Sequence, residues 1–219
     1  MYTISDLFEL SHTQAGAYLS RFTYPWEALA GLKDFIIELG QTLDLEEFTE
    51  VSSQVWVAKS AVVAPTAYLG APCIVGPETE IRHCAFVRGS ALVGRGCVVG
   101  NSVELKNVIL FDKVQVPHYN YVGDSILGYM AHMGAGSITS NVKSDKSLVV
   151  VRQGVEVTQT GLKKFGAMLG DRAEIGCNSV LNPGTVVGRD ATVYPLSCVR
   201  GTVPENHIYK TCNVVVPRV

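Results

Sequence analysis

The stretch VAKSAVVAPTAYLGAPCIVGPETEIRHCAFVRGSALVGRGCVVGNSVEL, residues 57–105, decides the fold of this chain. Every sixth position in it is apolar: Val57, Val63, Leu69, Val75, Ile81, Val87, Val93, Val99 and Leu105. Four residues after each lies a small or β-branched residue: Ala61, Ala67, Cys73, Thr79, Ala85, Ala91, Cys97, Val103 and Ile109. A period of six fits neither an α-helix nor one alternating strand. It is typical of a triangular parallel β-helix, in which each hexad forms one side and three hexads form one coil.

The repeat continues beyond Leu105 with two shorter steps. It advances by five residues from Leu105 to Leu110 and from Val122 to Leu127, and it resumes after an interruption at Leu169, Ile175, Leu181, Val187, Val193 and Val199. The interruption, residues 140–168, contains LVVV, RQG and VEVTQT, which predict a β-hairpin that projects from the coils. The predicted fold class is therefore all-β: a parallel β-helix over residues 51–219 with an inserted hairpin.

Residues 1–50 carry helical signals instead of hexads. Short amphipathic segments are predicted at 6–10 and 14–22, followed by a longer helix that starts at Pro25 and ends at Gly40. Its apolar face would hold Leu29, Leu32, Ile36 and Leu39. Because a solenoid leaves its first coil open, we expect residues 1–50 to form a helical cap.

Composition excludes several classes of partner. With 47% apolar residues among 219, the chain can bury one sizeable core. Charged residues make up 17% and the formal net charge is −2, so no basic field favours nucleic acid or anionic membrane. No apolar run reaches the length of a membrane span, and the N-terminus lacks the features of a signal peptide. We expect a cytoplasmic protein.

The six cysteines form no C-x-x-C pair, and a chain of this size needs no disulfide framework. They are Cys73, Cys84, Cys97, Cys177, Cys198 and Cys212. We interpret them as reduced thiols, most of them small residues of the core.

Stacking of the coils brings distant charges together. Arg88 and Lys106 are eighteen residues apart, about one coil, so they should lie one above the other. Two stacked cations repel each other unless an anion lies between them or a carboxylate lies beside them. Glu104 could neutralise part of their charge, but a phosphate bound between the two cations fits the pair better. Independent solvated side chains remain an alternative. The insertion carries further cations, which are either a solvated face or contacts to the phosphates of a ligand: Lys143, Lys146, Arg152, Lys163 and Lys164.

A second column contains a histidine. Counting with the five-residue steps places Asn101, His118 and Ala135 in one column, so that the imidazole lies beside the backbone of residues 134–136. The residues Gly134, Ala135 and Gly136 lack bulk, so a ligand can approach their N–H groups. A lone histidine is more often structural, but these neighbours favour a site.

These residues resemble a known family. The segments FVRGSALVGRGCVVGNSVELKN, PHYNYVGD and MGAGSITSN, between residues 86 and 141, and IGCNSVLNPGTVVG (175–188) are similar to the left-handed parallel β-helix acyltransferases. In particular they resemble the acetyltransferase half of the bifunctional N-acetylglucosamine-1-phosphate uridylyltransferases. The resemblance covers most of the β-helix and excludes the N-terminal helices and the hairpin. It implies the left hand of the helix, a homotrimer with sites between neighbouring prisms, and a role in UDP-N-acetylglucosamine biosynthesis.

The resemblance also implies roles for individual residues. Arg88, Lys106 and Tyr121 would hold a sugar phosphate, with Glu104 beside them, while His118 would be the general base and Asn141 would position the amine. The reaction would be acetyl transfer from acetyl-coenzyme A to the amine of an amino-sugar phosphate or a nucleotide-linked amino sugar. The coenzyme would lie along Ala135, Gly136 and Cys177, with the Ala135 N–H on the thioester carbonyl.

Three residues depart from the family pattern. His132 stands where the family has a sugar-binding asparagine, Val142 replaces a tyrosine, and Cys177 replaces a serine. Acceptor and acyl donor are therefore open. The glycine-rich nucleotide loop of the uridylyltransferase half is missing, so we expect no nucleotidyl transfer.

Two other functions were weighed. Carbonic anhydrases on this fold need three histidine ligands, two of them close in sequence, whereas here only His83, His118 and His132 lie in the coils and no H-x-x-x-x-H occurs. We therefore expect no metal site. A non-catalytic protein that binds sugar phosphates or sugar nucleotides is the stronger alternative, and it should ignore acetyl-coenzyme A.

Overall fold

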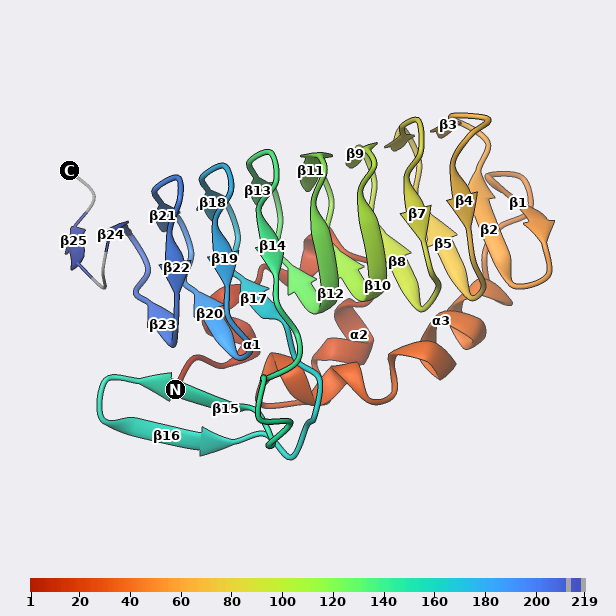
Figure 1. Cartoon of the computed structure of the whole chain (residues 1–219). Coiled ribbons are helices and arrows are strands. Elements are labelled where there is room, and N and C mark those ends of the chain that lie inside the picture. Colours follow the sequence, from red (N-terminus) through yellow and green to blue (C-terminus); the bar gives the residue numbers. More distant parts are fainter. Residues whose placement is uncertain (212–213, 218–219) are drawn as a thin grey trace.

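A computed structural model describes residues 1–211 and 214–217. The chain winds into stacked coils whose short strands pair in parallel with the coils above and below, as Figure 1 shows. The parallel β-helix predicted from the hexads is confirmed, and so is the left hand that the resemblance implies. The coils have three sides, and the strand pairs divide them into two large sheets.

The first sheet supplies two sides of the prism. One contains β4 (Tyr68–Leu69), β7 (Phe86–Val87), β14 (Ile138–Thr139), β19 (Val180–Leu181) and β22 (Cys198–Val199). The other contains β2 (Val55–Ala58), β5 (Cys73–Val75), β8 (Ala91–Val93), β17 (Ala167–Leu169), β20 (Thr185–Val187) and β23 (Thr202–Val203). Two longer strands belong to both sides: β10 (Glu104–Leu110) and β12 (Tyr121–Leu127).

The second sheet is the third side. It contains β3 (Val62–Val63), β6 (Glu80–Ile81), β9 (Val98–Asn101), β11 (Gln115–His118), β13 (His132–Met133), β18 (Glu174–Ile175), β21 (Thr192–Val193) and β24 (His207–Thr211). Antiparallel strands cover both ends of the stack: β1 (Phe48–Ser52) on β2, and β25 (Val214–Pro217) on β24. These pairs remove the open edges that would otherwise recruit other chains.

Corner residues explain the period. Residues with positive φ recur along the chain at the corners, including Glu78, Cys84 and Ser90 at intervals of six. The interval falls to five between Ser102 and Asn107 and again between Tyr119 and Asp124. These are the two five-residue steps of the sequence, and there β10 and β12 continue around the corner as single strands.

The interior is filled by the first residue of each hexad. Val75, Ile81 and Val87 have no exposed surface, and the later run from Leu169 to Val199 is equally buried. Small residues such as Ala91 and Cys97 fill the crowded positions beside them. The hexad pattern therefore identifies both the fold and its core.

The N-terminal helices lie along a flank of the coils, which differs from the expected cap over the open end (Figure 1). They are α1 (Ile4–Leu7), η1 (Leu10–His12), α2 (Gly16–Leu19), η2 (Pro25–Leu29) and α3 (Leu32–Gly40). The Asp171 N–H donates to the Leu7 carbonyl over 3.0 Å, and the ring centroids of Phe8 and Phe111 are 5.0 Å apart. The helices bury apolar surface on this flank, and β1 covers the end in their place.

The long helix predicted from Pro25 to Gly40 is in fact two. It is interrupted at Ala30 and Gly31, where a Cβ on Gly31 would lie 2.9 Å from the hydroxyl of Tyr18. Close packing against Tyr18 therefore needs a glycine at a position that ends the first segment. The predicted end at Gly40 agrees with the structure.

The insertion forms the predicted hairpin, β15 (Val150–Gln153) against β16 (Glu156–Gln159). It leaves the coils after Asn141 and returns at Phe165, whose N–H donates to the Asn141 carbonyl over 3.0 Å. Phe165 is fully buried and stacks on Trp26 with a centroid distance of 5.8 Å. The hairpin thus projects from a closed and well-packed neck.

The cysteine prediction was partly wrong. Cys73 and Cys97 are buried and free, and burial raises the pKa of each thiol to about 12. Cys84, Cys177 and Cys198 are free but exposed, because they lie on corners or outward positions. Cys212 lies outside the described residues.

Candidate active site

The centre of the candidate site is a buried carboxylate, Asp124. It lies at the corner of β12 with a φ of 49°, and only 3% of the residue is exposed. Its Oδ1 accepts hydrogen bonds from Lys106 Nζ (2.8 Å) and Asn107 Nδ2 (2.9 Å), and its Oδ2 accepts from Asn141 Nδ2 (2.6 Å). Three donors, two from the preceding coil and one from the following coil, therefore converge on one side chain.

These contacts hold Lys106 and Asn141 in fixed positions. A buried carboxylate is tolerated only when it is paired and its lone pairs are used, and both conditions are met here. The Lys106 side chain keeps 28% of its surface exposed. The ammonium is therefore anchored and still reachable from solvent.

Tyr121 joins this cluster from the start of β12. A Cβ on Gly123 would lie 2.5 Å from the Tyr121 hydroxyl, so the phenol ring lies across the bare backbone of Gly123. Asn141 Nδ2 donates to that hydroxyl over 3.1 Å. Burial, and then the charges of Asp124 and Glu104, raise the pKa of Tyr121 above its usual value. The phenol is therefore protonated at neutral pH and can donate to an anion.

Arg88 stacks on Lys106 as the eighteen-residue spacing predicts. The Arg88 N–H donates to the Leu105 carbonyl over 2.8 Å, which fixes the register of the two coils. Each cation, however, has its own carboxylate: Arg88 Nη1 lies 2.8 Å from Glu104 Oε1, as Lys106 does from Asp124. The Arg88 pair is exposed and therefore weak, so a phosphate could replace Glu104 there.

His118 lies on a different corner, exposed at the end of β11. Its neighbour in the preceding coil is Asn101, and on the other side the Gly136 N–H donates to the His118 carbonyl over 3.0 Å. The predicted column is therefore confirmed. Within the described part of the chain the Ala135 N–H donates to no acceptor, while the N–H groups of Gly134 and Gly136 are both used.

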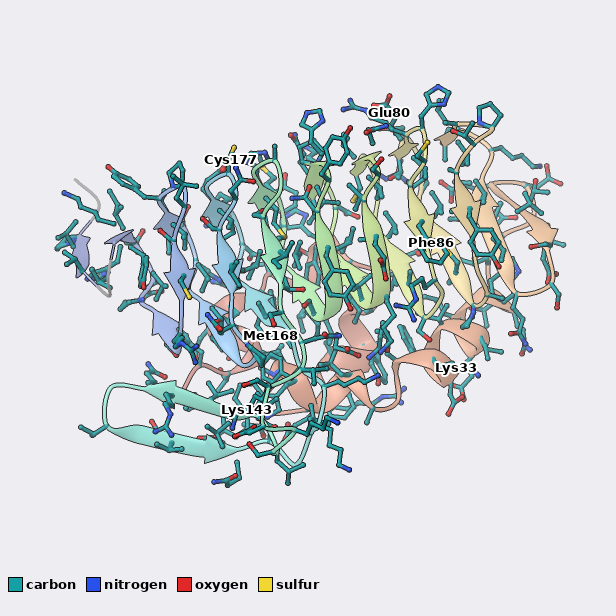
Figure 2. All side chains as sticks on the ribbon, in the orientation of Figure 1. Lys33, Glu80, Phe86, Lys143, Met168 and Cys177 are labelled. Carbon is teal, nitrogen blue, oxygen red and sulfur yellow. The ribbon has the colours of Figure 1, made fainter. Side chains whose placement is uncertain are left out.

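The glycines of this corner also have a packing reason. A Cβ on Gly134 would lie 2.7 Å from the Cys177 nitrogen, and one on Gly136 would lie 2.2 Å from Asn178 Oδ1. The bare backbone is thus required by the next coil and also leaves the corner open. Cys177 follows in this column, and Figure 2 shows it at the outer rim of the coils.

His132 does not join the cluster around Asp124. It pairs in register with Gln115, three residues before His118, and its Nδ1 lies 2.8 Å from Glu174 Oε2. The structure brings together Lys106, Tyr121 and Asn141, with Glu104 on the strand of Lys106 and Arg88 in the preceding coil. It keeps His118, Ala135 and Cys177 on another corner. That corner is the edge at which the side containing Tyr121 begins, whereas Asp124 lies at the opposite edge of the same side.

The sequence reading missed Asp124 and Asn107. The signal was present, because Asp124 is eighteen residues after Lys106 and seventeen before Asn141, close to one coil in both directions. Applying the stacking count to carboxylates as well as cations would have found it.

Comparisons with known proteins agree with this fold. Residues 74–212, more than half of the chain, match the model of the GMPPB C-terminal domain. The chain belongs to the GMPPB C-terminal domain family. The chain is 24% identical over 217 residues to the bifunctional protein GlmU of Methanococcus maripaludis, an alignment of 97% of this chain and 52% of the relative. It is 34% identical over 175 residues to the bifunctional protein GlmU of Trichormus variabilis, covering 79% and 33%.

The chain spans about half the length, or less, of the curated relatives it matches. The first alignment includes the N-terminal helices and the hairpin, which the motif-based resemblance excluded. Among solved structures, the acetyltransferase domain of PglB from Neisseria gonorrhoeae with acetyl coenzyme A is 16% identical, with a TM-score of 0.35 over 74% of this chain and 56% of that one. A likeness of that size carries no structural argument.

Among residues 1–211 and 214–217, no three His, Cys, Asp or Glu side chains are grouped so that they could hold a metal ion. Within the same residues no helix is long and apolar enough to cross a membrane.

Proposed function

We propose that this chain transfers an acetyl group from acetyl-coenzyme A to the amine of an amino-sugar phosphate or a nucleotide-linked amino sugar. The observation that carries the proposal is the His118 corner, where an exposed imidazole lies one coil from the unengaged Ala135 N–H. The likeness to the GlmU relatives supports the same class of reaction. No nucleotidyl transfer is part of the proposal.

The chemistry follows from these two groups. The amine attacks the thioester carbonyl carbon while His118 takes one of its protons. The Ala135 N–H donates to the carbonyl oxygen as negative charge develops on it. The carbon–sulfur bond then breaks, and the coenzyme leaves as a thiolate that takes up a proton. Gly136 and Cys177 would line the path of the coenzyme, and Asn141 would orient the amine.

The phosphate of the acceptor would bind at the anchored cations. Lys106 is fixed by Asp124 and remains partly exposed, Tyr121 offers a protonated hydroxyl, and Arg88 can exchange Glu104 for an anion. Charge-assisted hydrogen bonds to phosphate are the stronger kind, so this cluster favours a phosphorylated acceptor. His132 lies outside this cluster, on β13, and it would contact the sugar from there.

We further propose a cytoplasmic homotrimer. The cluster around Asp124 and the His118 corner lie at opposite edges of one side of the prism. A second prism packed beside that side would contribute one of these two edges to the groove between the prisms. One ligand in the groove could then contact the Asp124 cluster of one prism and the His118 corner of the other.

The deciding experiment replaces His118 with asparagine. General-base help is typically worth ~100- to 10,000-fold, so His118→Asn should lower turnover by about that factor without a change in melting temperature. Release of thiol from acetyl-coenzyme A would be measured with a panel of amino-sugar phosphates and nucleotide-linked amino sugars. His83→Asn is the matched control, because His83 is exposed two coils earlier in the same column.

Two outcomes would contradict the proposal. If no amine supports thiol release, or if His118→Asn keeps full activity, the non-catalytic binding protein takes its place. In the same preparations, light scattering at micromolar concentration should give the mass of three chains, and a monomer would exclude the trimer.

A further inference from the structure

The foot of the hairpin forms a cleft against the C-terminal coils, two coils beyond the candidate active site. Strand β15 lies over the corner at Gly201, where Thr202 Oγ1 donates to the Arg152 carbonyl over 2.8 Å. A Cβ on Gly201 would come within 3.1 Å of that carbonyl oxygen, so the close approach needs a glycine. Two adjoining hollows, of about 290 and 250 Å³, share Arg152, Arg200 and Gly201 in their walls.

The arginines of this chain show why the cleft is unusual. Of the eight described, five pair with carboxylates and one lies over a tyrosine ring: Arg82 with Glu80, Arg88 with Glu104, Arg95 with Glu47 and Glu78, Arg172 with Asp190, Arg189 with Asp171, and Arg21 over Tyr18. Within the described residues, the remaining two have no side-chain partner. They are Arg152 and Arg200, and both line this one cleft.

The surroundings of the two arginines do not neutralise them. Among the residues that the structure describes, no aspartate or glutamate lines either hollow. The one lysine in the walls, Lys143, pairs with Asp145 at 3.6 Å and bonds to Ser147; Figure 2 shows it at the foot of the hairpin. Two guanidinium groups that share a cleft repel each other, and an anion between them removes that cost. The planar guanidinium suits phosphate oxygens in particular.

The cleft lies on the same side of the prism as the candidate active site. Thr139, Leu181 and Val199 pair in register on three successive coils, so Arg200 lies two coils beyond the coil that carries Asn141. Neighbouring strands are about 4.8 Å apart, which makes this separation roughly 10 Å along the axis. One extended ligand could reach both places.

We propose that Arg152 and Arg200 bind the diphosphate of a small organic molecule. The proposed reaction, on which the choice of ligand rests, has two substrates of this kind, coenzyme A and a nucleotide-linked amino sugar. Both carry a diphosphate at a distance from the reacting group. The hairpin then has a role, because it supplies one of the two arginines to a site that the coils alone would leave incomplete.

Calorimetry of the full chain with three probes tests the site: coenzyme A, uridine diphosphate and inorganic phosphate. Arg152→Gln and Arg200→Gln should each weaken binding of at least one diphosphate probe by roughly tenfold or more, as expected for a hydrogen bond to a charged group. Arg82→Gln is the control, because it removes a partly exposed arginine whose charge is already paired with that of Glu80. Its affinities should stay at the wild-type values.

The pattern of losses identifies the ligand. A loss confined to coenzyme A assigns the cleft to the acyl donor, and a loss confined to uridine diphosphate assigns it to the acceptor. Unchanged affinity of the double variant for both, or no binding of either to the wild type, would overturn the site. These binding measurements do not require turnover, and His118→Asn should bind the probes like the wild type. A failure of the acyl-transfer proposal would therefore be distinguished from a failure of this site.

Discussion

Two basic regions on one side of the prism differ in how far carboxylates of the chain neutralise their positive charge. In the first, Lys106 and Arg88 each lie 2.8 Å from a carboxylate oxygen of the chain itself. In the second, Arg152 and Arg200 line a cleft whose described wall residues include no aspartate or glutamate. The first region is built from the coils, and the second depends on a segment inserted into them.

This difference distinguishes cations that hold a ligand in a fixed position from cations that attract it by unpaired charge. A cation bound by a buried carboxylate is held in one geometry, so its side chain loses little conformational entropy when a ligand binds. Its charge, however, is already partly neutralised by the carboxylate. An unpaired arginine exerts its full charge and must be ordered by the ligand. We infer that the first region holds the acceptor's phosphate in a fixed position, whereas the second region is ordered by the ligand that it attracts. Three changes test this contrast, described from the largest expected effect to the smallest.

Removal of Asp124 should have the largest effect. Asp124→Ala leaves Lys106, Asn107 and Asn141 without their shared acceptor, and the free energy of unfolding should fall by about 3 kcal/mol, the low end for a broken buried pair, because Lys106 stays partly exposed. Urea unfolding at fixed protein concentration measures it. Glu78→Ala, which removes a carboxylate that is 67% exposed, should stay within about 0.5 kcal/mol of the wild type. Equal stability of the two variants would show that Asp124 anchors nothing.

Removal of Lys106 should affect one ligand and spare another. Lys106→Ala should weaken binding of an amino-sugar phosphate by about 1.5 to 3 kcal/mol, the range for hydrogen bonds to charged groups. The same sugar without its phosphate should lose far less, and binding of coenzyme A should be unchanged. Calorimetry with the three ligands decides. Similar losses for all three would mean that Lys106 is structural and that the two regions do not divide the work.

Tyr121 gives the smallest effect, on the alkaline side. Its folded pKa is raised, chiefly by burial, so the neutral phenol stabilises the fold below the ordinary pKa of about 10 and that contribution is lost as pH rises through the folded value. Wild type should therefore lose stability more steeply above about pH 10 than Tyr121→Phe does. Unfolding midpoints across alkaline pH provide the comparison. Parallel curves would place Tyr121 outside the buried cluster.

By itself, the sequence determined the coil. Hexads from Val57 to Val199 predict the parallel β-helix, its interior residues and even the two places where a strand runs round a corner, because each coil repeats one steric requirement at a fixed interval. The same interval brings Arg88 over Lys106, and His118 beside Ala135. Periodic packing can be read from one chain because neighbours in space are separated by a constant number of residues.

Only the tertiary structure decided the contacts that break this interval. The flank occupied by the N-terminal helices, the break at Gly31 and the docking of β15 on Gly201 all join segments whose spacing follows no repeat. The convergence of Lys106, Asn107 and Asn141 on Asp124 depends on side-chain directions at a corner, which the count of residues leaves open. Periodicity fixes which backbones are neighbours, whereas the pairing of each charge is settled by the side chains that three-dimensional packing brings within hydrogen-bonding distance.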